Sequence, residues 1–213
     1  MPQAQQKTRT QLYLVTPPVT EAESIIEELG AALDAGEVAC VLLDPGEADE
    51  HSAKKTIRAV GALVQPKGTA LLVAGSASLA ARAGADGVHL SSPGPGLAEA
   101  LDSLKPERIV GVSGIRSRHD AMMVAETGID YVMFGEPHRD GGVPSLSSVI
   151  ERTEWWAELF EIPCVAYAPD FDSIGPLAAA GADFVALAPR IWLDEGEAGP
   201  ILASALRVLE ERA

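Results

Sequence analysis

The sequence predicts an α/β fold, a single TIM-barrel domain in which eight units of β-strand and α-helix close into a (βα)8 barrel. Length and composition are the first reason. A chain of 213 residues with 47% hydrophobic content suffices for one core and lies near the short end of the range for such barrels. The second reason is a phrase that occurs four times, in which a glycine is followed within two residues by an acidic residue and then by a short apolar run.

The spacing of these copies indicates how many units the chain contains. Their glycines are Gly36, Gly84, Gly128 and Gly181, which lie 48, 44 and 53 residues apart. A compact βα unit takes roughly 20 to 25 residues, so each interval has room for one additional unit. Glycine can supply the positive φ that ends a helix, and the apolar run after it suits a strand buried on both faces.

Eight strands can then be assigned in order. Four belong to the repeated phrase, with apolar runs at 38–43, 87–90, 131–134 and 184–187. The other four are Gln11 to Thr16, Ala70 to Gly75, Arg108 to Ser113 and Pro163 to Ala168. Helical segments with apolar faces fill the gaps, at about 20–35, 51–64, 77–83, 97–104, 117–127, 145–160, 172–180 and 197–211.

Alternation of short strands with helices predicts parallel pairing and closure. A doubly wound open sheet is the structural alternative, but it usually has about five or six strands, and eight units fit a closed barrel better. We expect residues 1–10 to be a flexible N-terminal segment and residues 11–213 to form the barrel domain.

Charge and composition exclude several classes of function. Acidic residues outnumber basic ones by 31 to 16, and the net charge of −15 repels nucleic acids and anionic membranes. The longest apolar runs are too short to cross a bilayer, and no signal sequence is visible, so we expect a soluble, cytoplasmic protein. Cys40 and Cys164 lie in apolar runs as reduced, buried thiols. A small phosphorylated ligand stays compatible with this charge, because one phosphate needs few donors.

Motifs at the predicted strands resemble the thiamine phosphate synthase and TenI family. The similarity extends in order from about Gln11 to Trp192. Its motifs are Gln11-Leu-Tyr-Leu-Val-Thr-Pro, Gly84-Ala-Asp-Gly-Val-His-Leu, Val110-Gly-Val-Ser, Asp130-Tyr-Val-Met-Phe-Gly, Ile162-Pro-Cys-Val-Ala and Gly181-Ala-Asp-Phe-Val-Ala.

The resemblance implies a role in thiamine (vitamin B1) biosynthesis. The family's synthase joins a pyrimidine pyrophosphate to a thiazole phosphate with loss of pyrophosphate, a reaction that needs Mg²⁺ on carboxylates and cationic clamps. This chain departs from that pattern after most strands, so we identify it as a divergent member in which the metal and pyrophosphate residues are mostly lost. The departing segments are Val41-Leu-Leu-Asp-Pro, Ala74-Gly75, Ser91-Ser-Pro-Gly94, Glu136-Pro-His-Arg-Asp-Gly-Gly, Ala168-Pro-Asp and Pro189.

Because barrel enzymes place their sites after the carboxyl ends of the strands, residues at those positions are the candidates. Glu136, with His138, is the candidate for proton transfer, at the position where TenI-like thiazole tautomerases carry a histidine. A shielded carboxylate can act as a general base. The alternative is a solvated loop carboxylate or one paired with Arg139.

Hydroxyl and guanidinium groups near the same ends are candidates for binding a phosphate or carboxylate. They are Ser113, Arg116, Arg139 and Arg190, with His89 in the fourth strand and Arg118 as a weaker member. Ordinary salt bridges with nearby aspartates are the alternative for the arginines, and structural packing is the alternative for His89.

Three functions stay open on this basis. The first is a thiamine phosphate synthase-like transferase acting on a thiazole phosphate or similar small phosphorylated heterocycle. The second is a TenI-like thiazole tautomerase, and the third is a catalytically silent barrel that binds a thiamine-related ligand or a protein partner. No cofactor or metal site is indicated by spacing, although Mg²⁺ stays open. Trp155, Trp156 and Phe160 form an apolar cluster that either covers the barrel or contacts a second copy in a homodimer.

Overall fold

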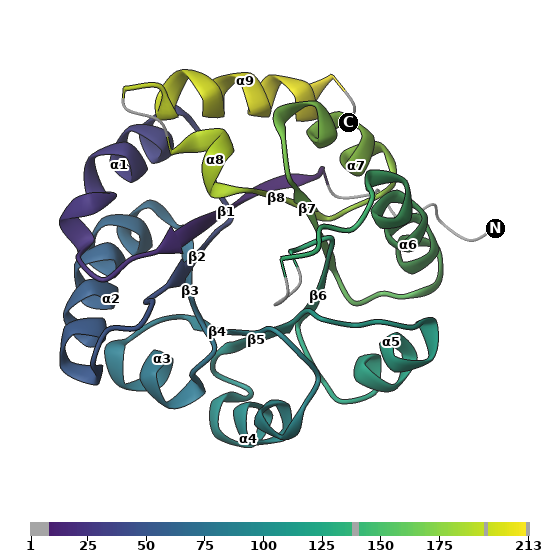
Figure 1. Ribbon diagram of the computed structural model, residues 1–213, viewed down its shortest axis with the longest axis horizontal. Coiled ribbons are helices and arrows are strands. Elements are labelled where there is room, and N and C mark those ends of the chain that lie inside the picture. Colours follow the sequence, from purple (N-terminus) through teal and green to yellow (C-terminus); the bar gives the residue numbers. More distant parts are fainter. Residues whose placement is uncertain (1–8, 138–140, 194–195, 212–213) are drawn as a thin grey trace.

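The computed structural model describes residues 9–137, 141–193 and 196–211, and in them eight parallel strands close into a barrel in the order β1 to β8 (Figure 1). The predicted fold class is confirmed. The strands are β1 Gln11–Pro18, β2 Cys40–Asp44, β3 Ala70–Ala74, β4 Gly87–Leu90, β5 Ile109–Val112, β6 Tyr131–Phe134, β7 Cys164–Ala168 and β8 Phe184–Leu187.

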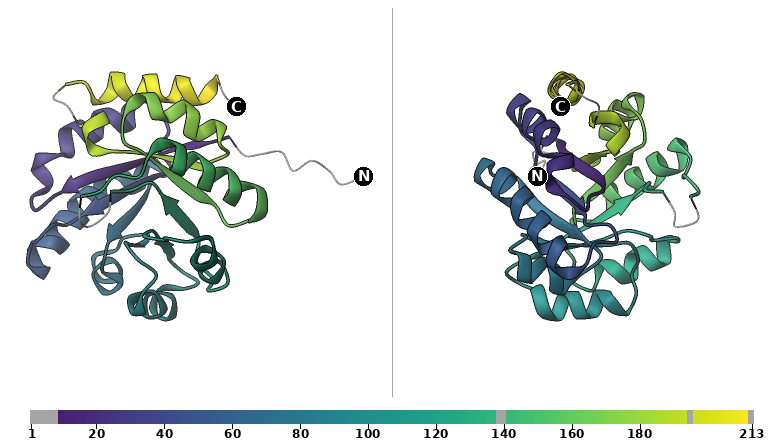
Figure 2. Two further views of the ribbon diagram at one scale, coloured as in Figure 1. Left: turned by 45° about the vertical axis from the view of Figure 1, so that its right-hand side comes forward. Right: turned by 60° about the vertical axis from the view of Figure 1, so that its left-hand side comes forward.

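Helices surround the strands on the outside of the barrel (Figures 1 and 2). The α-helices are α1 Ile26–Ala35, α2 Glu50–Val64, α3 Ala77–Ala83, α4 Pro95–Leu104, α5 Arg118–Ala125, α6 Leu146–Leu159, α7 Ile174–Ala179, α8 Pro189–Trp192 and α9 Ala198–Glu210. Helix α9 packs beside α1, so the last helix closes the outer ring against the first. None of the helices in the described ranges has the length and apolar content to cross a membrane.

The observed helices differ from the prediction in two ways. The segments expected at about 20–35 and 172–180 each begin with a 3₁₀ turn, Ala22–Ser24 and Phe171–Ser173, before the α-helix starts. The short helix α8 was not predicted. It begins at Pro189, whose fixed φ suits the first position of a helix.

In three of the four copies of the repeated phrase, the acidic residue is an aspartate that links neighbouring strands at the amino-terminal end of the barrel. The carboxylates of Asp86, Asp130 and Asp183 accept the main-chain N–H of Leu71, Val110 and Cys164, at 2.7, 2.7 and 2.8 Å. In return, each aspartate donates its own main-chain N–H to the carbonyl of the same partner. Each of β4, β6 and β8 is therefore fixed in register against the strand before it in sequence.

Of the predicted N-terminal segment, the structure describes only residues 9 and 10, since residues 1–8 lie outside the described ranges. Thr10 donates its hydroxyl to the Ala182 carbonyl at 2.8 Å, and Arg9 forms an ion pair with Glu210 at 2.9 Å. The chain is thus attached to the barrel two residues before β1 begins. A flexible segment stays a prediction for residues 1–8.

We expect Asp183→Ala to lower the free energy of unfolding by about 2 kcal/mol, because a charged acceptor is lost and the Cys164 N–H loses its partner. Asp183→Asn keeps an oxygen that can accept the same bond, so its loss should be smaller. Urea unfolding followed by circular dichroism measures both. Equal losses in the two variants would contradict the assigned role of the hydrogen bond.

Candidate active site

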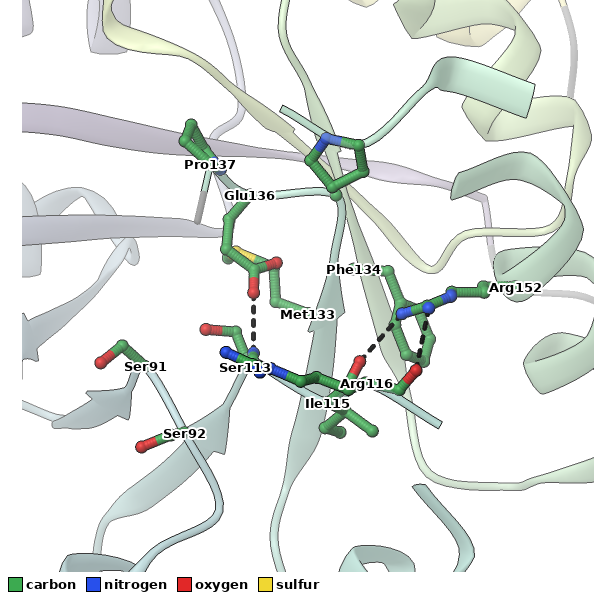
Figure 3. A pocket seen from close by; sticks show the side chains of 13 residues that line it. Ser91, Ser92, Ser113, Ile115, Arg116, Met133, Phe134, Glu136, Pro137 and Arg152 are labelled. Atoms are coloured by element: carbon green, nitrogen blue, oxygen red, sulfur yellow. Dashed lines mark hydrogen bonds between the residues drawn. The ribbon is translucent and has the colours of Figure 1, made fainter. Parts of the chain in front are cut away.

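A pocket of about 740 Å³ opens at the carboxyl ends of β4, β5 and β6, which is the end of the barrel where the sequence predicts a site (Figure 3). Its walls come from the last two residues of β6 and from the loops after these strands, at 91–92, 113–116 and 135–137, together with Pro144 and Arg152 of the next segment. Three of the candidates from the sequence, Ser113, Arg116 and Glu136, line this one cavity.

The loop after β5 is held from two sides. Glu136 Oε1 accepts the main-chain N–H of Gly114 at 2.7 Å, and the Arg152 guanidinium donates to the carbonyls of Ile115 and Arg116 at 2.9 and 3.0 Å (Figure 3). Arg152 belongs to α6, so it spans from an outer helix to the pocket wall. Together the two charged groups hold Ser113 and Arg116 at the ends of a loop whose backbone is fixed.

Gly114 is required at the centre of this loop. Its φ is +68°, a conformation that side chains disfavour, and a Cβ there would lie 2.2 Å from the Ser91 carbonyl oxygen. The glycine thus lets the loops after β4 and β5 touch. This contact brings the hydroxyl groups of Ser91 and Ser92 to the same cavity as Ser113.

His89 lies beneath the pocket, inside the barrel. Its Nε2 is 3.1 Å from Ser113 Oγ, and its Nδ1 is 2.7 Å from the Tyr131 hydroxyl, which in turn lies 3.0 Å from the Tyr13 hydroxyl. Tyr131 also stacks on the His89 ring, with centroids 5.6 Å apart. A chain of polar side chains therefore runs from β1 through β6 and β4 to the floor of the pocket.

A glycine makes room for this chain. A Cβ on Gly111 of β5 would lie 2.0 Å from the Tyr131 ring, so only glycine lets that ring cross to His89. The Gly of the Val110-Gly-Val-Ser motif thus serves the side chain of the neighbouring strand. Sequence reasoning gave His89 a packing role as one alternative, and its buried position agrees with that, but the partners Tyr131 and Tyr13 were not predicted.

Burial keeps the chain uncharged. It lowers the pKa of His89 from 6.5 to about 4, and it raises the pKa of Tyr131 and of Tyr13 well above the usual value of 10. Coulombic interaction between the two tyrosines adds to the increase at Tyr13. At neutral pH all three groups are therefore neutral hydrogen-bond partners.

Of the remaining predicted residues, one lies outside the pocket and two lie outside the described ranges. Arg190 is exposed beyond β8, where its Nε donates to the Pro169 carbonyl, and it does not line the pocket. Burial raises the pKa of Tyr167 in β7. The positive charge of Arg190 opposes this increase, and the negative charge of Glu136 adds to it. His138 and Arg139 lie outside the described residues and stay predictions.

Arg118 forms a salt bridge, as the alternative for the arginines predicts, but with a glutamate in place of an aspartate. Its guanidinium pairs with Glu151 at 3.1 Å and lies over the Trp155 ring, 5.0 Å from the centroid. Both partners belong to α6, on the outside of the barrel. Because Arg118 is the first residue of α5, its side chain follows the helix surface and pairs with the next helix.

In the aromatic cluster of Trp155, Trp156 and Phe160, at the end of α6, Trp156 points toward the strands of the barrel. Trp156 is 0% exposed, packs edge-on against Phe134 of β6 with centroids 5.7 Å apart, and donates its indole N–H to the Ile162 carbonyl at 2.7 Å. Phe160 stacks on it at 4.1 Å. This arrangement covers the barrel, as one of the two alternatives for the cluster predicts.

The described residues supply few ligands for a magnesium ion. Mg²⁺ takes about six oxygen ligands in octahedral geometry, commonly with one or two carboxylates. Glu136 is the single carboxylate in the described wall of the pocket, and one of its oxygens already accepts the Gly114 N–H. Across the described ranges, no three His, Cys, Asp or Glu side chains gather closely enough to share a metal ion.

Chemically, the pocket offers both hydrogen-bond donors and a carboxylate acceptor at the loop after β5. Ser113 and the exposed Arg116 can give hydrogen bonds to a phosphate or carboxylate oxygen. Glu136 faces the same cavity with a carboxylate that can receive a hydrogen bond or a proton. Arg152, which sequence reasoning missed, acts on the loop backbone, and its position in a helix gave no signal of that contact.

The chain is similar to several known proteins. The family model described as thiamine monophosphate synthase matches residues 12–191. A thiamine-phosphate synthase of Rhodospirillum centenum is 38% identical over 200 residues, covering 93% of this chain and 96% of that protein. One from Hyphomonas neptunium is 35% identical, covering 94% and 93%. The solved thiamine phosphate pyrophosphorylase of Pyrococcus furiosus is 20% identical with a TM-score of 0.78, covering 96% of this chain and 98% of its own, and shows the shared fold.

We expect stability to fall as the pH drops below the usual histidine pKa, because His89 resists protonation only in the folded protein. The folded value of about 4 lies below 6.5, so the unfolded chain takes up the proton first. Between pH 7 and pH 5 this should cost about 2 kcal/mol of unfolding free energy, at about 1.4 kcal/mol per pKa unit. His89→Gln should lack this component in urea unfolding at the two pH values, and an identical pH dependence in both proteins would refute it.

We expect Arg152→Ala to loosen the loop after β5, because the carbonyls of Ile115 and Arg116 lose both donors. Hydrogen exchange of the loop amides, Gly114 included, should accelerate about tenfold, as expected for the loss of about 1 to 1.5 kcal/mol of local stability. Arg207→Ala on α9, whose guanidinium contacts its own helix, is the control and should leave these amides unchanged. Unchanged exchange in Arg152→Ala would mean that the loop is held without Arg152.

Proposed function

Because the chain belongs to the thiamine monophosphate synthase family, we propose that it is an enzyme of thiamine biosynthesis acting on a thiazole phosphate or a similar small phosphorylated heterocycle. The family resemblance predicted from the strand motifs is confirmed by the match over residues 12–191 and by relatives aligned along nearly the whole chain. Those relatives carry the name thiamine-phosphate synthase, which supports a role in the same pathway.

The observation that carries the proposal is the meeting of Ser113, Arg116 and Glu136 in one cavity at the carboxyl end of the barrel. In our proposal Ser113 and Arg116 bind the phosphate of the ligand, since a hydroxyl and a guanidinium fork both donate to anionic oxygens. Arg152 fixes the loop that carries them. His138, Arg139 and Arg190 stay additional candidates from the sequence, the first for proton transfer and the two arginines for the anion.

Two reactions fit this binding mode. The first is the synthase reaction, the joining of a pyrimidine pyrophosphate to the thiazole phosphate with loss of pyrophosphate, which the names of the relatives favour. The second is proton transfer on the thiazole, favoured by Glu136: its carboxylate is positioned by the Gly114 N–H and faces the cavity. In that reaction Glu136 takes a proton from one atom of the heterocycle and returns it to another, so that the tautomer changes while the phosphate stays bound. A barrel that binds the ligand without turnover is the third candidate.

The decisive measurement is an assay of the purified protein with pyrimidine pyrophosphate and thiazole phosphate, with Mg²⁺ and with EDTA. Formation of thiamine phosphate identifies the synthase reaction. Aromatisation of a thiazole tautomer, without coupling, identifies proton transfer. Binding in a calorimetric titration with neither reaction identifies the silent barrel, and absence of binding to all of these compounds would reject the proposal.

Glu136→Gln should lower the rate of proton transfer by at least about 100-fold while leaving the affinity for thiazole phosphate within about twofold, because an amide can accept the Gly114 N–H but cannot act as a base. Glu151→Gln is the matched control, since that carboxylate pairs with Arg118 outside the barrel. Full turnover by Glu136→Gln would remove Glu136 from the chemistry. If Glu136→Gln also leaves the rate of the synthase reaction unchanged, that result is consistent with the synthase reaction as the function.

A further inference from the structure

The polar chain inside the barrel ends at the one hydroxyl that both lines the pocket and bonds to a buried histidine. Ser113 is 1% exposed, and His89 is the partner of its Oγ in the described structure. His89 is bonded on its other side to Tyr131, and Tyr131 to Tyr13. Tyr13 also has a hydrogen bond with the buried thiol of Cys40. The direction in which the protons point along this chain decides what Ser113 can offer a ligand.

Two directions are possible for a neutral histidine, which has one N–H and one bare nitrogen. If Nδ1 carries the proton, Nε2 must accept, and the Ser113 proton is used by His89. If Nε2 carries the proton, it donates to Ser113, and the Ser113 hydroxyl keeps its own proton for the pocket. The first direction makes Ser113 an acceptor toward the ligand, and the second makes it a donor.

The distances favour the second direction. Hydrogen bonds with an O–H donor are typically shorter, about 2.7 to 2.8 Å, than those with an N–H donor, about 2.9 to 3.0 Å. The bond between Tyr131 and His89 Nδ1 is 2.7 Å, which suits a phenol donating to the ring. The bond between Nε2 and Ser113 is 3.1 Å, which suits the ring donating to the serine.

Acidity supports the same direction. A phenol is intrinsically more acidic than an aliphatic hydroxyl and is therefore the stronger donor, so the ring nitrogen that accepts a bond is better matched to Tyr131 than to Ser113. Tyr131 can then accept from Tyr13, so that Tyr131 and His89 both donate and accept. Stacking of Tyr131 on His89 keeps the two rings in place.

We propose that His89 and Tyr131 are positioning residues that hold Ser113 as a hydrogen-bond donor, so that the floor of the pocket selects an anionic oxygen. The proposal deepens the function proposed above and rests on the same pocket. With Ser113 and Arg116 as donors and Glu136 as an acceptor, the ligand class is an anion that also carries an N–H or another acidic hydrogen.

The first test reads the proton directly. Nitrogen-15 NMR of the full chain labelled at histidine shows which nitrogen of each ring is protonated, and His89→Gln identifies the His89 signals. At pH 7 we expect His89 to be neutral with its proton on Nε2, with and without inorganic phosphate. A proton on Nδ1, or on both nitrogens, would overturn the proposal, whatever the enzymatic activity. Failure of the proposed function therefore stays distinguishable from failure of this inference.

The second test measures coupling. Tyr131→Phe should weaken the binding of inorganic phosphate about fivefold, the effect of one hydrogen bond of about 1 kcal/mol. Ser113→Ala should weaken it by a similar factor, and the double variant should be no weaker than Ser113→Ala, because Tyr131 acts through Ser113.

Tyr13→Phe is the matched control, because it removes the same hydroxyl one step farther along the chain while Tyr131 can still donate to His89. Its phosphate affinity should stay within about twofold of the original. Additive losses in the double variant would show a merely structural effect of Tyr131 and would overturn the positioning role.

Discussion

The register of the strands is the constraint on which the site depends. Asp86, Asp130 and Asp183 each exchange two hydrogen bonds with one residue of the preceding strand, and so fix three pairs of strands at the amino-terminal end. Side chains of a strand alternate between the two faces, so a slip by one residue would turn His89 and Tyr131 from the barrel interior toward the helices. Pairing at one end of the barrel thereby determines which groups meet at the other end.

Much of the fold could be predicted because its signals are local. A glycine that ends a helix and an aspartate that begins a strand recur within a few residues, and their spacing gives the number of units. The strand-end rule likewise identified Ser113, Arg116 and Glu136, which do share a pocket. The contacts that organise them were not predictable, because Arg152 lies 36 residues from Arg116 and Tyr13 lies 118 residues from Tyr131. The salt bridge of Arg118 was one of the stated alternatives, but its partner was not predictable, because Glu151 lies 33 residues farther along the chain.

Two charged groups at the pocket, Glu136 and Arg152, hold its wall in place through hydrogen bonds to the main chain. Glu136 and Arg152 use charge-assisted hydrogen bonds on the main chain of the loop after β5, where each contributes more than a neutral partner would. Arg116 alone extends from that loop as an exposed cation. A fixed backbone with one flexible guanidinium suits a small anion, since the loop need not become ordered when the ligand binds.

Gly111 and Tyr131 share one volume inside the barrel, because the space a methyl group would need at position 111 is filled by the phenol ring. Position 111 therefore cannot gain a side chain while Tyr131 is present. A lineage that acquires any side chain at position 111 must also replace the tyrosine 20 positions later by something smaller, and it then loses the link between β4 and β6. The two positions are therefore coupled, and descendants of this chain that carry a side chain at position 111 should also differ at position 131.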